Sequence, residues 1–256
     1  MMGTPIEGTG CLTDKYGTTR LVDKSFLGQP VLDYIKPSVN KENPEVRPAT
    51  TDEFERAELG LQWQWQANPC KEWYSLEERK GWLRLYIDNG RLEGKSTLYE
   101  LPHVLTQMLP AASFTVTTKV ELVDKELDDA CGLILTGEIY NYVTLIHNDE
   151  DYFLEYRQGY STDTGAKEEC IQSIKIHSSK VYLRAYVYPD MLEDKKAVGQ
   201  FFYSIDGKTF KEIGEAFYLS PGKWVGAKIG LFATNFEKGK SIGYADFNWI
   251  RIDEVR

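Results

Sequence analysis

Residues 114–122 read FTVTTKVEL and residues 181–188 read VYLRAYVY. In both stretches, apolar residues occupy every second position and alternate with polar or aromatic ones. This period of two predicts β-strands with one buried face and one wet face. Further β-rich runs occur at 131–137, 141–147, 151–157, 170–177, 200–205, 227–233 and 243–252. Without a convincing amphipathic helix, the pattern predicts an all-β chain folded as an antiparallel β-sandwich or barrel.

Two tryptophan- or leucine-rich stretches extend this pattern toward the N-terminus. Leu61, Trp63 and Trp65 alternate with glutamines, and residues 83–87 alternate in the same way. We expect Leu61, Trp63, Leu83 and Leu183 to face inward, and Trp63, Trp65 and Trp249 to lie in the core, because large rings gain most from burial.

A hairpin is predicted at residues 202–210, FYSIDGKTF. Asp206-Gly207 suits a left-handed turn, and Ser204 and Asp206 are placed to accept hydrogen bonds from turn amides. Phe210 is expected to return to the core.

Composition narrows the class of protein. The chain has 256 residues, a net charge of −9 and 13% aromatic residues. A length of this kind fits one large domain, and the acidic balance disfavours nucleic acid as a partner. No apolar run approaches the roughly 18 residues of a membrane span, so no membrane partner is expected.

The chain has two compositional parts. Residues 28–51 hold four of the ten prolines, and residues 1–50 carry six basic and six acidic side chains, so the whole net charge belongs to the rest. Proline at this density favours an extended segment. The sequence therefore predicts a strap or linker over 1–50 and a folded module over 51–256.

Several stretches, taken in order, resemble the C-terminal module of glycoside hydrolase family 43 enzymes, the β-xylosidase and α-L-arabinofuranosidase group. They include PVLDYIKPSV (30–39), LGLQWQWQANP (59–69), CGLILTGEIYNYVTL (131–145) and GYADFNWIRI (243–252). The resemblance implies a concanavalin A-like β-sandwich, or jelly roll, that follows a five-bladed catalytic β-propeller. Residues 1–28 resemble at most the exit of that propeller.

The resemblance also implies a function. The family's catalytic Asp, Asp and Glu lie in the propeller, so we expect an accessory module of a hemicellulose-degrading glycosidase without catalytic residues of its own. It is expected to pack on the propeller and to shape subsites for xylan- or arabinan-derived oligosaccharides. A periplasmic or extracellular location is favoured if a signal lies upstream.

Two other functions stay open at this point. One is a free-standing, lectin-like carbohydrate-binding domain. The other is an autonomous glycosidase, which needs two converging carboxylates. The best local acidic cluster, Glu121, Asp124 and Glu126, does not have the spacing that sandwich-fold glucanases use.

Candidate binding residues follow from the alternation. Polar residues opposite the core positions combine amides and guanidinium groups with aromatic rings, which suits sugar recognition. They are Gln62, Gln64, Arg84, Tyr86, Arg184 and Tyr186. Gln66 continues the same face. The alternative is that these residues cover a sheet or contact a neighbouring domain.

A structural Ca²⁺ site is a further expectation. Glu53 opens the module and Asp246 lies in its last predicted strand. Terminal strands of a sandwich often pair, and hard carboxylates are the ligands that Ca²⁺ prefers. The family resemblance strengthens this expectation, since related sandwiches frequently hold calcium.

Overall fold

The structure, a computed structural model, describes residues 3–5, 9–13, 19–23, 28–30, 49–88, 97–163, 165–192, 196–237 and 240–255. The chain divides into two compact units, Met1–Arg47 and Pro48–Arg256. In the first unit, β1 (Gly3–Pro5) pairs with β4 (Gly28–Pro30), and β2 (Thr9–Thr13) pairs with β3 (Thr19–Asp23). Most of the proline-rich segment, residues 31–48, lies outside the described residues. The strap over 1–50 stays a prediction.

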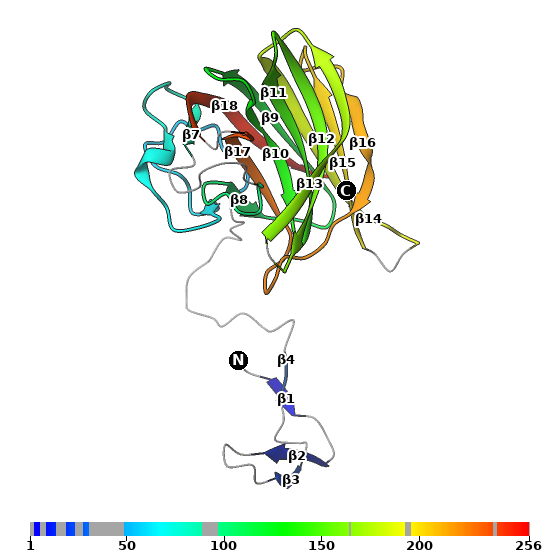
Figure 1. Ribbon diagram of the computed structural model, residues 1–256. Coiled ribbons are helices and arrows are strands. Elements are labelled where there is room, and N and C mark those ends of the chain that lie inside the picture. The colour runs from blue at the N-terminus through cyan, green and yellow to red at the C-terminus, as the bar shows by residue number, and fades with distance from the viewer. Residues whose placement is uncertain are drawn as a thin grey trace. The chain divides into compact units, whose positions relative to one another are not determined.

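The second unit contains two sheets, each of seven described strands, stacked as a sandwich (Figure 1). Sheet I has the order β13 (Gly165–Ile176), β12 (Asp151–Thr162), β11 (Ile139–Asn148), β10 (Asp129–Thr136), β17 (Lys228–Asn235), β8 (Leu105–Met108), β5 (Gln64–Trp65). Sheet II has the order β16 (Lys211–Tyr218), β15 (Ala197–Ser204), β14 (Lys180–Pro189), β9 (Phe114–Val123), β18 (Lys240–Glu254), β7 (Leu83–Asp88), β6 (Tyr74–Ser75). All pairs are antiparallel, which confirms the predicted sandwich.

The main core lies between the two sheets. On β14, Val181, Leu183, Ala185 and Val187 are all buried, as the alternation predicts, and they meet the inner residues of sheet I. Each large apolar side chain removed from water in this way contributes about 1.5–3 kcal/mol. No described helix is long and apolar enough to cross a bilayer; the short 3₁₀ turn η2 (Lys71–Trp73) lies between β5 and β6.

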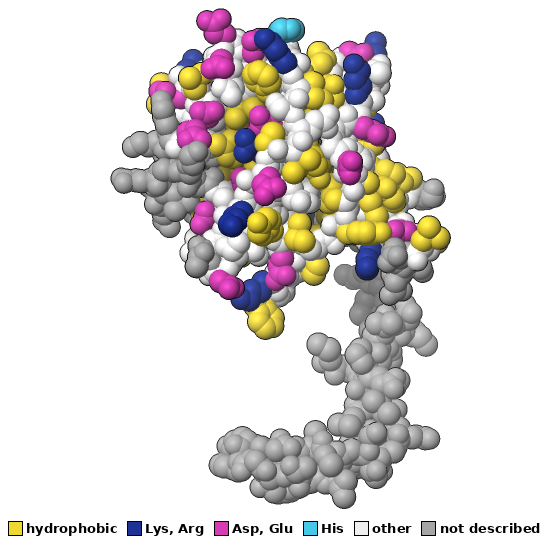
Figure 2. All heavy atoms as spheres, turned by 45° about the vertical axis from the view of Figure 1, so that its right-hand side comes forward, with side chains coloured by type: hydrophobic (Ala, Val, Ile, Leu, Met, Phe, Trp, Pro, Cys, Tyr) yellow, Lys and Arg dark blue, Asp and Glu magenta, His cyan; other side chains and the backbone are white. Residues whose placement is uncertain are grey.

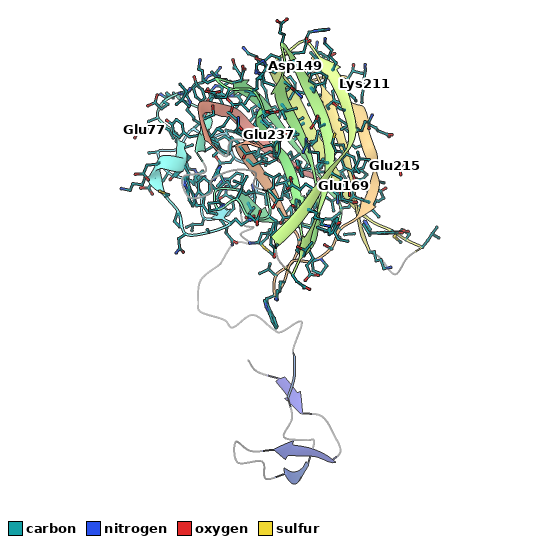
Figure 3. All side chains as sticks on the ribbon, in the orientation of Figure 1. Glu77, Asp149, Glu169, Lys211, Glu215 and Glu237 are labelled. Atoms are coloured by element: carbon teal, nitrogen blue, oxygen red, sulfur yellow. The ribbon has the colours of Figure 1, made fainter. Side chains whose placement is uncertain are left out.

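Strand register defines two ends of the sandwich. At one end, Thr136, Lys228 and Met108 lie side by side in sheet I. The short connection 109–113 joins this end to Phe114 of sheet II. Gln107 donates to the carbonyl of Thr50 at 3.0 Å, so the chain enters the module here, and we call this the entry end. The opposite end carries the β11–β12 turn, where Figure 3 labels Asp149.

The predicted strand at 61–66 is largely a turn. The Trp63 amide donates to the Gly60 carbonyl at 3.1 Å, and Leu61 is fully exposed instead of facing inward. A turn closed by this bond breaks the two-residue period, so pairing begins only at Gln64. Trp63 is nevertheless buried, and its indole N–H donates to Asp52 at 2.8 Å.

A β-bulge reverses the prediction for Trp249. On β18, Phe247 pairs with Val120 while Trp249 pairs with Lys119, the very next residue of β9, so Asn248 is the extra residue. A bulge shifts the phase of every side chain beyond it. Ile250 therefore enters the core, and Trp249 lies half-exposed on the outer face of sheet II.

The central strands of sheet I, β10, β11 and β17, are buried on both faces. A second apolar cluster on its outer face joins the segment 98–104 to side chains of β10, β11 and β17, among them Tyr140, Tyr142 and Phe232. Glu168 on β13 ties this cover down by accepting from the hydroxyls of Tyr140 and Tyr142 and from the Leu98 amide, at 2.7–2.8 Å. The edge strand β13 of sheet I is largely exposed, and among the described residues no second cluster of this kind covers the outer face of sheet II.

The predicted hairpin turn is confirmed. Asp206 accepts from Ser204 and from the amides of Lys208 and Thr209, each at 2.8 Å, and Gly207 has φ 72°. Phe210 differs from expectation. It lies under the guanidinium of Arg184, 3.6 Å from the ring centroid, and not in the main core.

Candidate functional site

Exposed apolar side chains gather at the entry end. Among the described residues, nine of the fifteen exposed large hydrophobics lie on its strand ends and loops: Met108, Ile139, Tyr160, Met191, Leu192, Tyr218, Trp224, Val225 and Val255. Figure 2 shows hydrophobic side chains reaching the lower edge of the sandwich. Exposed apolar side chains that gather at one end of a domain are typical of an interaction surface.

A surface pocket of about 380 Å³ opens beside these residues. Three segments form its walls. They are the β5–β8 edge of sheet I at Gln66 and Thr106, the β10–β11 turn at Gly137, and the loop before β17. Tyr99 and Lys228 add an aromatic ring and an ammonium group to the wall. The pocket thus combines one ring with amide, hydroxyl and cationic donors.

Trp224 stands at the tip of the loop before β17. Its φ of 68° lies in the left-handed region, and its side chain is 94% exposed. The Val225 amide closes the turn by donating to the Gly222 carbonyl at 3.4 Å. A bulky residue with this backbone is a strained exception that concentrates at functional sites. A turn alone would favour Gly or Asn at this position.

Gln66 lines this pocket, and Gln64 contacts one of the lining residues. Gln66 donates to the carbonyl of Leu98 at 3.2 Å and to that of Tyr99, which holds the Tyr99 segment against the pocket. Gln64 accepts from the ammonium of Lys228 at 3.3 Å. The amides therefore position the ring and the cation that face the opening.

The structure does not bring the six predicted sugar-binding residues together. Gln64 lies at the entry end, while Gln62, in the turn at 60–63, donates to Asp52 at 3.2 Å. The other four lie on the outer face of sheet II, and β9 and β18 separate the β7 pair from the β14 pair. They are Arg84, Tyr86, Arg184 and Tyr186.

Arg84 belongs to an ionic network that excludes it from simple ligand binding. It binds Asp246 through two hydrogen bonds of 2.8 and 3.0 Å, which raise the pKa of Arg84. Arg79 bridges Asp246 and Glu121 at 3.2 and 2.9 Å. Burial raises the pKa of Glu121, but its bonds to Arg79 and Lys180 outweigh that effect and lower it. The network is electrostatically satisfied within the sheet.

The predicted calcium ligands do not fit a shared metal site. Asp246 is buried beneath two arginines, and Glu53 is held by Arg251 through bonds of 2.7 and 2.9 Å. Within the described ranges, no group of three or more His, Cys, Asp or Glu residues is placed to hold a metal ion. A cation would have to displace an arginine from each carboxylate. The calcium site stays a prediction that this geometry does not favour.

A second hollow, of about 470 Å³, opens at the opposite end near Asp151, Tyr152 and Lys180. Its polar groups are engaged with neighbours. Lys175 pairs with Asp151, and the Tyr152 hydroxyl donates to Asp124 at 2.5 Å. Burial, together with this bond, raises the pKa of Tyr152 to about 12. None of the predicted site residues lines this hollow.

Sequence reasoning missed Trp224, Tyr99 and Lys228. One signal was present: Pro221-Gly222 marks a turn, and a tryptophan two residues later serves no purpose in the turn itself. Tyr99 and Lys228 had no comparable signal, because they are far apart in the sequence and line one pocket only in the folded chain.

Comparison with known proteins gives consistent matches. Residues 51–253 match the family model described as the β-xylosidase C-terminal concanavalin A-like domain. The β-xylosidase of Formosa agariphila is 27% identical over 249 residues, which cover 90% of this chain and 39% of that protein.

Solved structures show the same fold. The bifunctional GH43-CE protein of Bacteroides eggerthii superposes with a TM-score of 0.68 at 26% identity, over 80% of this chain and 27% of that one. The GH43 BlXynB protein of Bacillus licheniformis gives 0.71 at 20% identity, over 96% and 46%. The chain spans less than half the length of each of these three relatives.

Proposed function

Because the chain belongs to the family of β-xylosidase C-terminal concanavalin A-like domains of glycoside hydrolase family 43, we propose that it is an accessory module of a hemicellulose-degrading glycosidase. It docks through its entry end on a catalytic β-propeller. Hydrolysis of xylan- or arabinan-derived oligosaccharides is the work of that propeller.

The observation that carries this proposal is the clustering of exposed hydrophobics at the entry end. The cluster surrounds the point where the chain enters the module, next to Thr50. A domain joined to the chain just before Thr50 would be closest to the entry end of the module. Burying side chains such as Met191, Leu192 and Trp224 against a partner would remove their apolar surface from water.

The pocket at the same end supports a part in shaping sugar subsites. Trp224 projects from its edge with a strained backbone, and Tyr99, Gln66 and Lys228 line it. Rings pack against the C–H faces of sugars, while amides and ammonium groups bind hydroxyls. We infer that Trp224 closes one side of a subsite whose other side belongs to the propeller.

A chimera tests the docking. Residues 1–256 replace the C-terminal part of the Formosa agariphila β-xylosidase, and thermal unfolding is measured for the chimera and for the isolated chain. Met191→Ser with Leu192→Ser is expected to lower the Tm of the chimera by about 4 °C, as loss of about 1 kcal/mol would do. The isolated chain, where both residues are exposed, is expected to keep its Tm.

Ile205→Ser with Ile242→Ser is the matched control, because both residues are exposed at the opposite end. Equal effects of the two pairs on the chimera would contradict docking at the entry end. For the subsite, Trp224→Ala in the chimera is expected to raise KM for xylobiose without changing Tm. An unchanged KM would reject that part.

A further inference from the structure

Aromatic rings and cations alternate on the outer face of sheet II. The ammonium of Lys119 lies 5.6 Å from the ring centroid of Trp82 and 5.7 Å from that of Tyr182. The ring of Tyr182 lies 6.2 Å from that of Trp249. All four side chains are half-exposed, so they form a surface with three rings around one cation.

Strand register builds this surface. Lys119 on β9 pairs with Tyr182 on β14 and with Trp249 on β18, so the three side chains form one row across the sheet. Trp249 is in this row only because Asn248 forms the bulge. Bulges that re-aim a side chain are common next to functional sites. Trp82 completes the row from the start of β7, with Arg79 stacked on it at 3.5 Å.

The neighbouring row carries a second cation. Arg184 pairs with Thr117, two residues before Lys119 on the same face, so Arg184 and Lys119 are diagonal neighbours. Its guanidinium donates to the Thr117 hydroxyl at 2.8 Å and covers the ring of Phe210. Burial lowers the pKa of Arg184, and this effect is larger than the opposite effect of the Asp253 charge.

These two cations differ from the others on the face. Arg79, Arg84, Lys180 and Arg251 each pair with a carboxylate within 4 Å. No described carboxylate lies within that distance of Lys119 or Arg184. In a chain with a net charge of −9, this leaves a local excess of positive charge among rings. A half-buried cation without a counter-charge is costly unless a ligand supplies one.

We propose that this surface binds acidic oligosaccharides, that is, pyranose chains that carry a uronic acid carboxylate. The rings of Trp82, Tyr182 and Trp249 pack on sugar faces, and Lys119 and Arg184 bind the carboxylate. Acidic oligosaccharides fit better than other ligands, because a neutral sugar or an apolar partner would leave both cations unpaired. The surface is separate from the entry end and does not depend on the docking proposed there.

Calorimetric titration of the full chain tests the proposal. The probes are a xylotriose that carries one glucuronic acid and unsubstituted xylotetraose. We expect the acidic probe to bind at least about tenfold more tightly, as one charge-assisted contact allows. Lys119→Gln with Arg184→Gln is expected to abolish that preference. Raising NaCl from roughly 0.02 M to roughly 0.5 M is expected to weaken binding of the acidic probe only, because salt screens the ion pair.

Lys125→Gln is the matched control, since it removes one exposed lysine from the opposite end of the sandwich. Trp249→Ala is expected to weaken binding of both probes while Lys119→Gln weakens only the acidic one. Equal affinity for the two probes, no binding of the acidic probe, or a loss that Lys125→Gln reproduces would overturn the proposal. Concentration-dependent dimerisation that Lys119→Gln abolishes would also overturn it and assign the surface to a second copy.

Discussion

Arg84 on β7 and Asp246 on β18 face each other across a strand pair, with Nε–Oδ1 at 2.8 Å and Nη2–Oδ2 at 3.0 Å. Asp246 is 1% exposed, and its carboxylate is paired with Arg84 and Arg79. The bond joins sequence positions 162 residues apart and fixes the first long strand of the module against its last. A buried pair of this kind stabilises only while both partners are present.

Removing one partner therefore costs more than removing both. Asp246→Asn leaves Arg84 and Arg79 without their buried carboxylate, and we expect a loss of about 3 kcal/mol in the free energy of unfolding. Arg84→Met with Asp246→Leu is expected to lose less than the sum of the single changes. Urea denaturation of the unsubstituted chain, Arg84→Met, Asp246→Leu and the double variant completes the cycle, and additive losses would contradict the coupling.

Trp63 is buried, whereas the bulge at Asn248 turns Trp249 outward, so we expect their substitution to have different costs in stability. Trp63→Ala removes a buried ring and its hydrogen bond to Asp52, with an expected cost of about 3–5 kcal/mol. Trp249→Ala removes a half-exposed ring, so a cost of about 1 kcal/mol is expected. Chemical denaturation compares them directly. Similar costs would place Trp249 back in the core.

Strain at Trp224 predicts a gain in stability. A φ of 68° suits glycine without strain. Trp224→Gly is expected to raise the free energy of unfolding of the isolated chain by about 0.5–1 kcal/mol. Trp224→Ala keeps the strain and serves as the control. A Gly variant no more stable than the Ala variant would contradict the proposed backbone strain.

The turn at Asp206 responds to acid. Hydrogen bonds from the amides of Thr209 and Lys208 and from the Ser204 hydroxyl lower the pKa of Asp206 from 3.8 to about 2. Because the folded-state pKa is depressed, the stabilisation is present above pH 3.8 and is lost as the pH falls toward 2. NMR titration of the Asp206 carboxyl reads this pKa. Ser204→Ala is expected to raise it, and an ordinary value in the unsubstituted chain would reject the assignment.

Glu168 holds the cover of sheet I. Its carboxylate accepts three hydrogen bonds, including that of the Leu98 amide, so Glu168→Ala is expected to destabilise the segment 98–104 by about 1–3 kcal/mol. Hydrogen exchange at the Leu98 amide is expected to accelerate. Glu169→Ala on the same strand, exposed and labelled in Figure 3, is the control and is expected to leave that amide unchanged.

The sandwich was predictable because its long strands follow one rule. Along β9 and β14 every second residue is buried, so the pattern by itself gives strand, face and core. The rule failed where a local event changes its phase. A turn at Gly60–Trp63 turned Leu61 outward, and an extra residue at Asn248 turned Trp249 outward.

The candidate site was predictable only in part. Gln66 lines the entry-end pocket and Gln64 contacts one of its lining residues, but Arg84 and Asp246 bind each other, a pairing between distant strands that periodicity does not encode. Lys119 was not predicted. It matters because no described carboxylate lies close to it, and this depends on how β9 pairs with β14 and β18. Such relations depend on strand register, which a single sequence does not determine.

The burial of β10, β11 and β17 on both faces makes the two sheets unequal in how much substitution they tolerate. Substitutions on β10, β11 and β17 meet packed side chains on either face, as at Gly132, where an added methyl would meet the Val143 carbonyl oxygen at 2.1 Å. Outer positions of sheet II have no such constraint beyond their neighbours in the row. A library randomised at outer positions of sheet II away from the Arg84–Asp246 pair is expected to return folded variants far more often than one randomised on β10, β11 and β17, so new ligand preferences would arise on one side of the molecule.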